Sequence, residues 1–136
     1  MKVMAVDLGA VRTGLAISDE TGFLATPIGT ITQRDRQQLL CMVAEAAREH
    51  RAAHLVVGLP KNMDGTEGDS AHGAQEFAQK LGEMTGLSVT LWDERLTTMS
   101  AIGFLNETNV RGKKRKQVVD TVSAVIILQD YLDSRR

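Results

Sequence analysis

A carboxylate placed directly after a short apolar strand limits the folds that this chain can adopt. Residues 2–6 read Lys-Val-Met-Ala-Val, a run typical of a buried strand, and Asp7 follows it. Gly9 allows a tight turn, and after Gly14 the chain starts back as a hairpin partner. An ionised group at this place needs a hydrogen bond, a cation or a metal to offset its burial. The alternative is an Asp7 that caps the turn by accepting backbone N–H groups, and this stretch alone leaves both roles open.

Length and composition predict one ordinary globular domain. The 136 residues suit a single domain, 1–136, with one core, and 43% of them are apolar. The formal net charge of -1 means that any contact with nucleic acid must come from a local basic patch. The single cysteine, Cys41, excludes an internal disulfide framework, and its place beside Leu40 and Val43 predicts a buried structural thiol.

The chain carries no recognisable targeting signal. Its N-terminus lacks the apolar segment and small-residue cleavage site of a signal peptide, and no run approaches the length of a membrane span. We therefore expect a cytoplasmic protein that makes no membrane contact.

The rest of the sequence alternates between strand and helix patterns. Pro27 and Gly29 favour an edge strand within the third extended stretch, residues 23–32. Asp69 or Ser70 is expected to cap the second helix, which Gly86 stops. The expected helices are 34–51, 69–85, a short one from Thr97 or Thr98 to about 106, and 117–132. Two further strands are expected at 54–59 and 87–92. Residues 107–116 are expected to form a mobile polar stretch.

This order predicts an α/β fold with a mixed five-stranded sheet, in which three antiparallel strands are continued by parallel strands and flanked by helices. It is the order of the ribonuclease H-like fold. Because the carboxyl ends of parallel strands meet at one edge, we expect Asp7, Asp93 and Glu94 to converge there. The loop after Gly58 ends at the same edge, and Asp120, on the first turn of the last helix, can supply another carboxylate.

Such a cluster of acids indicates a cation site. Carboxylates packed together repel one another unless a cation neutralises them, and a set of oxygen ligands selects Mg²⁺ or Mn²⁺ rather than zinc. Strand alternation sends Asp93 and Glu94 to opposite faces, so only one of them can face the site. The other is expected to pair with Arg95 or to cap the next helix.

Four motifs carry a family resemblance over the whole chain. They are Asp7-x-Gly9-x-x-Arg12-x-Gly14-x-Ala16-x-Ser18-Asp19, Gly58-Leu59-Pro60-x-Asn62-Met63-Asp64-Gly65-Thr66, Asp93-Glu94-Arg95-x-Thr97-Thr98, and Asp120 followed by Ser123-Ala124. Together they closely resemble the YqgF/RuvX family, relatives of the RuvC Holliday-junction resolvase. The resemblance implies a bacterial nuclease that processes the 5′ end of pre-16S ribosomal RNA.

By the same resemblance Asp7, Glu94 and Asp120 match the acidic positions that bind metal and catalyse. It also favours Glu94 over Asp93 as the acid that faces the site. In the resolvases the last helix offers a second acid one turn after the first, where this chain has Ser123 and Ala124. This difference weakens the case for cleavage of four-way junctions more than the case for metal binding.

Cationic residues near these motifs are candidates for phosphate contacts. The cluster comprises Arg111, Lys113, Lys114, Arg115 and Lys116. Such a cluster is usually a solvated loop, but its place directly before Asp120 favours contact with a phosphate backbone. Arg12 is expected to grip a phosphate bidentately, or else to pair with a nearby acid. Arg95 is a further candidate.

The sequence therefore predicts a metal-dependent endonuclease, in which one or two Mg²⁺ or Mn²⁺ ions held by Asp7, Glu94 and Asp120 activate water for cleavage of a phosphodiester bond. The expected substrate is structured RNA, with branched DNA as the alternative. Other readings are a sugar-kinase-like ATPase, a non-catalytic RNA-binding factor of ribosome maturation and a structural dimer module. The ATPase architecture closes two such domains on a nucleotide, whereas this chain has one. A homodimer remains open.

Overall fold

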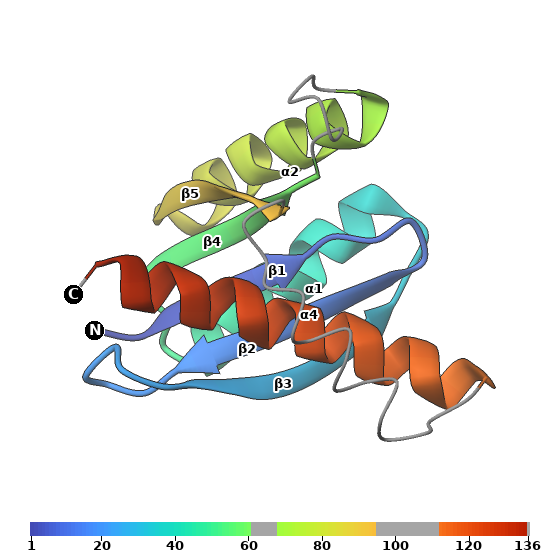
Figure 1. Ribbon diagram of the computed structural model, residues 1–136. Helices are drawn as coiled ribbons and strands as arrows, with labels where there is room; N and C mark the ends of the chain where they lie inside the picture. Colours follow the sequence, from blue (N-terminus) through green and yellow to red (C-terminus); the bar gives the residue numbers. More distant parts are fainter. Residues whose placement is uncertain (61–67, 95–111, 136) are drawn as a thin grey trace.

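Five strands form one mixed sheet in the order β3-β2-β1-β4-β5 (Figure 1). The structure, a computed structural model, describes residues 1–60, 68–94 and 112–135, with only the backbone for 112–121. The strands are β1 (Val3–Asp7), β2 (Arg12–Ser18), β3 (Ala25–Thr32), β4 (His54–Leu59) and β5 (Ser88–Asp93). The pairs β1–β2 and β2–β3 are antiparallel, while β1–β4 and β4–β5 are parallel. The predicted mixed sheet is confirmed, with β3 at one edge.

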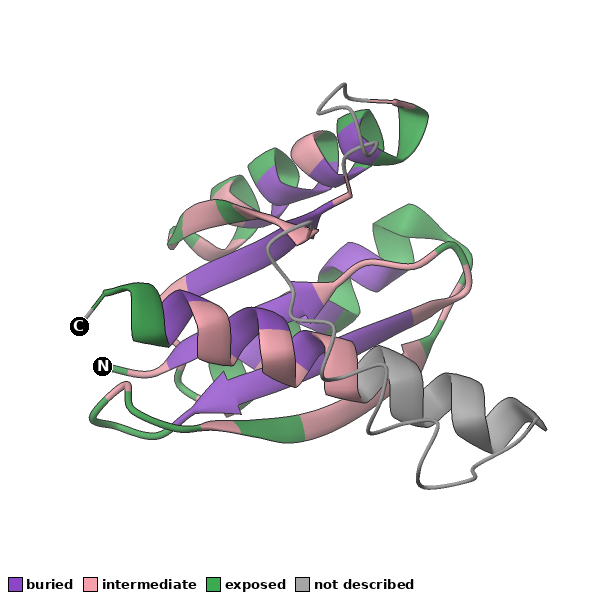
Figure 2. Cartoon of the chain, viewed as in Figure 1, coloured by how far each residue is buried: buried purple, intermediate pink, exposed green. Residues whose placement is uncertain are grey.

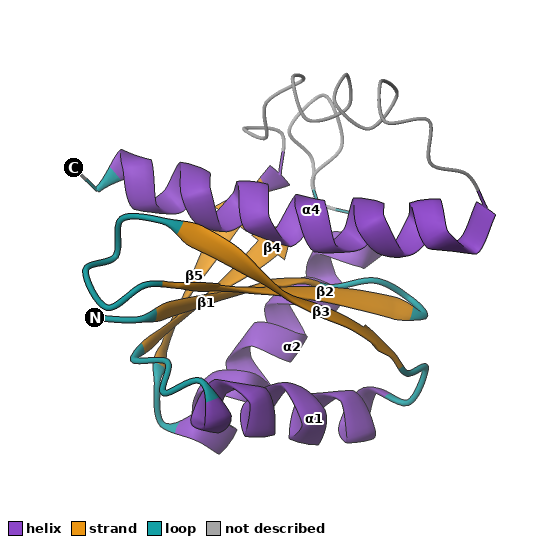
Figure 3. Ribbon diagram, turned by 90° about the horizontal axis from the view of Figure 1, so that it is seen from below, coloured by secondary structure: helices purple, strands orange, loops and turns teal. Residues whose placement is uncertain are grey.

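Helices cover both faces of this sheet. The helices α1 (Arg36–Glu49) and α2 (Asp69–Thr85) pack on one face, and α4 (Gly112–Ser134) crosses the other (Figure 3). Asp35 caps α1, and its carboxylate accepts a hydrogen bond of 2.9 Å from the backbone N–H of Gln38. Gly86 ends α2 in the left-handed conformation, with φ 73°.

Strand alternation divides the core into two layers. Along β1, Met4 and Val6 are buried against α1 and α2, whereas Val3 and Ala5 are buried against α4. Figure 2 shows that the strands β1, β2 and β4 are largely buried between these helices. Asp7 continues the alternation of Val3 and Ala5 and therefore lies on the α4 face of the sheet. The fold thus directs this carboxylate toward the helix that carries Asp120.

The last helix differs from its prediction. It begins at Gly112, five residues before the expected start, so Lys113, Lys114, Arg115 and Lys116 are helical rather than part of an irregular stretch. Asp120 accordingly lies well inside α4 and not in its first turn. Lysine, arginine and glutamine have good helix propensity, and extending an existing helix is easier than nucleating one. An apolar period is therefore not needed in this part of the helix.

Two smaller predictions were also wrong. Cys41 is exposed, because the buried stripe of α1 runs through Leu39, Leu40, Val43 and Ala47, and position 41 is turned about 100° away from position 40. The N-cap of α2 is Gly68, without a side-chain cap, and Asp69 and Ser70 lie inside the first turn. The short helix expected after Thr97 or Thr98 falls outside the described residues. No helix in the described part of the chain has the length and apolar character needed to cross a membrane.

Candidate active site

The turn that follows Asp7 is held from two sides. A Cβ atom at Gly9 would lie 2.0 Å from the carbonyl oxygen of Arg12, so this tight turn accepts only glycine. The backbone N–H of Gly9 donates to the Thr13 hydroxyl at 3.4 Å, and the guanidinium Nη1 of Arg36 donates to the Gly9 carbonyl oxygen at 2.9 Å. The sheet and α1 together therefore fix the end of β1, where Asp7 lies.

Glu94 brings a second carboxyl group to Asp7. It follows the last residue of β5, and its side chain is hydrogen-bonded to that of Asp7 at the end of β1. The strand β4 lies between β1 and β5, so the Glu94 side chain crosses β4 to make this contact. The structure thus brings together two of the three acids that the sequence singles out.

The environment of Glu94 disfavours its charged form. Burial raises the pKa of Glu94, the negative charge of Asp93 adds to this effect, and the hydrogen bond with Asp7 acts in the opposite direction. A hydrogen bond between two carboxyl groups requires one proton between them. The pair therefore either keeps a proton or needs a cation that replaces it.

The third predicted acid is placed only by its backbone. Position 120 lies four residues before Ala124, so helical spacing puts it on the same face of α4 as the buried residues Ala124, Ile127 and Tyr131. Among the residues whose side chains the structure describes, no three His, Cys, Asp or Glu side chains gather as a metal-binding group. The convergence of Asp7, Glu94 and Asp120 stays a prediction.

The predicted phosphate-binding cations are only partly described. Arg12 begins β2 at the end of the sheet where β1 finishes, since Asp7 pairs with Gly14 in the hairpin. Lys113, Lys114, Arg115 and Lys116 occupy the first turns of α4, and their side chains are outside the description. Arg95, Arg111 and the motif residues Asn62, Met63, Asp64, Gly65 and Thr66 also lie outside the described residues.

Two residues near the acid pair were not singled out by sequence reasoning for the roles that the structure gives them. Arg36 comes from the start of α1 and reaches Gly9 across 27 residues of sequence, and no local pattern signals such a contact. Gly58 of β4 lies directly against the Glu94 side chain, with ideal Cβ distances of 3.1 Å and 3.2 Å to its Cδ and Cγ atoms. A glycine inside a strand of Leu and Val residues was the available signal for this close approach.

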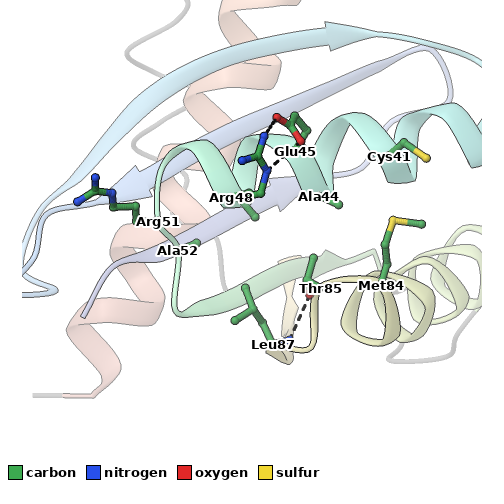
Figure 4. A pocket seen from close by; sticks show the side chains of 10 residues that line it. Cys41, Ala44, Glu45, Arg48, Arg51, Ala52, Met84, Thr85 and Leu87 are labelled. Atoms are coloured by element: carbon green, nitrogen blue, oxygen red, sulfur yellow. Dashed lines mark hydrogen bonds and ion pairs between the residues drawn. The ribbon is translucent and has the colours of Figure 1, made fainter.

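A groove of about 540 Å³ lies elsewhere, between the C-terminal halves of α1 and α2 (Figure 4). Cys41 and Met84 line one end of it, and Arg48, which is paired with Glu45, lies nearer its middle. Ala52 and Leu87 line its other end, just before β4 and β5 begin. The groove therefore sits at the opposite end of the sheet from Asp7 and does not contribute to the acid pair.

Comparisons with known proteins identify the family of this chain, and the matches extend over nearly its whole length. The sequence model of the RuvX family, described as Holliday junction resolvase, matches residues 1–134. A Bacillus cytotoxicus protein named "Putative pre-16S rRNA nuclease" is 44% identical over 99% of this chain and 100% of its own length. A Myxococcus xanthus protein of the same name is 42% identical over 100% of this chain and 90% of its own length.

A solved structure shares the architecture. RuvC of T. thermophilus, in complex with a Holliday junction substrate, superposes with a TM-score of 0.63 and covers 99% of this chain and 95% of its own. The two sequences are only 12% identical, so this likeness concerns the fold alone. It confirms the predicted ribonuclease H-like fold class.

Proposed function

The chain belongs to the RuvX family, described as Holliday junction resolvase, and is a nuclease. We propose that it uses a divalent metal ion to hydrolyse phosphodiester bonds at the 5′ end of pre-16S ribosomal RNA. The observation that carries this proposal is the contact between Asp7 and Glu94. Asp7 ends β1 and Glu94 directly follows β5, so the two acids meet at the carboxyl end of the parallel strands, the edge where ligands collect in α/β folds.

The donor set fits Mg²⁺ or Mn²⁺. Both ions prefer carboxylate oxygens, and an ion bound between Asp7 and Glu94 would replace the proton that a hydrogen bond between two carboxyl groups requires. Asp7 and Glu94 would hold the ion, and we propose Asp120 of α4 as the third ligand because its position continues the sheet-facing stripe of that helix. When bound, the ion supplies charge neutralisation for the oxygens that attack and leave the phosphorus.

The protein's own residues prepare the site before substrate arrives. The Gly9 turn and the Arg36 contact fix the end of β1, which limits the movement of Asp7. Partial burial of Glu94 excludes water from one side of its carboxyl group and strengthens its interaction with positive charge. We propose that Arg12, Arg95, Arg111 and the cations 113–116 hold the phosphate backbone, because they cluster in sequence around the motifs that carry the acids.

The relatives favour an RNA substrate. Both named relatives, which match this chain over nearly its full length at above 40% identity, carry a ribosomal RNA nuclease name. The family description favours branched DNA instead, and this is the second candidate. Ser123 and Ala124 stand where resolvases offer a further acid, which disfavours the second candidate. We also propose a cytoplasmic location, because the relatives are named as nucleases of ribosomal RNA.

A cleavage assay tests the proposal. Purified protein is incubated with an RNA that spans the 5′ boundary of 16S ribosomal RNA, with unstructured RNA and with a four-way DNA junction, each with Mg²⁺, with Mn²⁺ and with chelator. We expect metal-dependent cleavage of the precursor RNA and a loss of at least about 100-fold in rate for Asp7→Asn. The exposed Glu83→Gln on α2 is the matched control and should cleave normally.

Each other outcome has a clear meaning. Faster cleavage of the DNA junction would make the chain a resolvase. Binding of the precursor RNA without cleavage under any ionic condition would make it a non-catalytic maturation factor. Cleavage that survives Asp7→Asn would remove the acid pair from the mechanism.

A further inference from the structure

Glu94 has to cross a whole strand to reach Asp7. The sheet order places β4 between β1 and β5, and neighbouring strands are about 4.8 Å apart, so the backbones of β1 and β5 are separated by about 10 Å. In the strand registers Val57 of β4 lies opposite Val6, and Gly58 lies opposite Trp92. The Glu94 side chain turns back from the end of β5 and lies directly against Gly58, which is therefore the β4 residue that it passes over.

A side chain at Gly58 would fit only if its neighbours moved by a few tenths of an ångström. An ideal Cβ atom there would lie 3.1 Å from Cδ of Glu94 and 3.2 Å from its Cγ, and 3.0 Å from Cδ1 of Ile127. Ordinary van der Waals contacts between carbon atoms begin near 3.5 Å. The surface of Gly58 is thus covered by the Glu94 carboxyl group on one side and by α4 on the other.

Backbone conformation does not account for this glycine. The described glycines with positive φ are Gly22, Gly29 and Gly86, and Gly58 is not among them. Its neighbours Val56, Val57 and Leu59 are all buried side chains of an ordinary strand, and a glycine between them weakens the strand. The close approach of Glu94 and Ile127 is the feature that distinguishes this position.

We propose that Gly58 is a positioning residue: its missing side chain is the space in which the Glu94 carboxyl group lies against Asp7. Ile127 closes the other side of that space and so sets the distance between α4 and the acid pair at the same point. This inference rests on the proposed function, because it treats the Asp7–Glu94 pair as the metal-holding part of the site. A simpler alternative is that Gly58 only makes room for Ile127.

Two substitutions separate these explanations. Gly58→Ala adds the Cβ atom, and Ile127→Val removes the Cδ1 atom that this Cβ would meet. In the double variant the added methyl group has space on the α4 side, while its contact with Glu94 remains. The matched control is Gly73→Ala, at a glycine of α2 whose Cβ would have no neighbour within 4 Å.

The measurements are the melting temperature, Mn²⁺ affinity by calorimetry, and the rate of RNA cleavage. We expect Gly58→Ala to lower the melting temperature and to weaken Mn²⁺ binding by about 10- to 100-fold, as displaced supporting residues do at other metal sites. Adding Ile127→Val should restore most of the melting temperature but not the Mn²⁺ affinity. Recovery of both in the double variant would overturn the proposal, since it would show that Gly58 serves only Ile127.

A double-mutant cycle with Glu94 gives a second test. If Gly58→Ala alone does not fold, a folded Gly58→Ala/Glu94→Ala variant supports the proposal, and a double variant that also does not fold overturns it. Glu94→Ala removes the carboxyl group that the new methyl group would meet, so Gly58→Ala should cost less melting temperature in that background than in the wild type. Equal costs in both backgrounds would overturn the proposal. This comparison needs neither metal nor substrate, so a wild-type protein that fails to bind Mn²⁺ or to cleave RNA would refute the proposed function while the cycle still decides the role of Gly58.

Discussion

The carboxyl group of Glu94 is hydrogen-bonded to that of Asp7 across an intervening strand. Two acids in contact in a partly buried place oppose folding unless a proton or a cation lies between them. Proteins keep such arrangements mainly where function requires them. The pair is therefore the feature from which the behaviour of the metal-free and the metal-loaded protein can be predicted.

Divalent ions should stabilise the fold through this pair. We expect Mg²⁺ or Mn²⁺ to raise the melting temperature. Binding should add about 2.7 kcal/mol to the free energy of unfolding when the ion reaches 100 times its Kd. Asp7→Asn should abolish most of this rise, and the exposed control Glu83→Gln should keep it. Thermal unfolding at increasing ion concentration measures the effect. An unchanged melting temperature at millimolar ion would contradict a shared metal site.

Without metal, Glu94→Gln should make the protein more stable at neutral and alkaline pH. Burial raises the pKa of Glu94 in the folded chain above its unfolded value of about 4.3. Ionisation of Glu94 therefore weakens the fold as the pH rises through the folded pKa, and this loss is absent below the unfolded pKa. Glutamine cannot ionise, so its advantage should be present at pH 8 and vanish near pH 4.

Calorimetric melting of the wild type and Glu94→Gln in the presence of chelator measures how the difference in their melting temperatures changes between pH 4 and pH 8. Melting temperatures that differ by the same amount at every pH would show that folding does not raise the pKa of Glu94. The same variant should lose the stabilisation by Mn²⁺, because an amide is a weaker ligand than a carboxylate.

Much of the fold and part of the site follow from local patterns in the sequence. The alternation of Val3, Ala5 and Asp7 along one strand is enough to put Asp7 on a single face of the sheet, and the apolar spacing of α1 and α2 fixes which sides they bury. Cys41 shows the limit of such reasoning. One position along a helix is a rotation of about 100°, so a residue beside the buried stripe was assigned to it wrongly.

The contacts that build the site depend on the order of strands in space. Gly58 lies under Glu94 only because β4 is placed between β1 and β5, and Arg36 reaches Gly9 only because α1 begins at the same end of the sheet where β1 stops. A glycine inside an apolar strand signals a close approach at Gly58, but the residue types nearby in sequence do not identify Glu94 as its partner or Gly9 as the partner of Arg36. The start of α4 was missed for a different reason, since its first turns rely on helix propensity and lack an apolar period.

Asp19 should contribute stability that is lost in acid. Its carboxylate accepts hydrogen bonds from the Thr21 hydroxyl at 2.7 Å and from the backbone N–H groups of Phe23 and Leu24 at 2.8 Å and 3.2 Å. These bonds, the one from Thr21 first, lower the pKa of Asp19 to about 2. The contribution is therefore present above the unfolded pKa of about 3.9 and disappears as the pH falls toward 2.

The difference in melting temperature between wild type and Asp19→Asn should accordingly shrink between pH 4 and pH 2. Direct titration of the Asp19 carboxyl carbon by nuclear magnetic resonance gives the pKa independently. A midpoint near 4 would mean that the turn between β2 and β3 does not hold this carboxylate. Because the turn is far from the acid pair, the metal response of Asp19→Asn should equal that of the wild type.

The cations at the start of α4 should supply affinity for nucleic acid without supporting the fold. Changing Lys113, Lys114 and Lys116 to alanine replaces residues in helical positions by the best helix former, so the melting temperature should stay equal or rise. Binding should weaken to a similar extent for RNA and DNA of different sequence, and the salt dependence should flatten by about one unit of slope for each lost phosphate contact. Mn²⁺ affinity should not change.

Binding of one RNA and one DNA at several salt concentrations measures these slopes. Lys80→Ala on α2 is the matched control, because this exposed lysine is paired with Glu76 at 2.9 Å on the other face of the sheet, and its loss should leave the slope unchanged. Parallel slopes for the triple variant and the wild type would show that Lys113, Lys114 and Lys116 are solvated in the complex. Holding the backbone would then fall to Arg12 and Arg95, and Arg12→Ala should flatten the slope in their place.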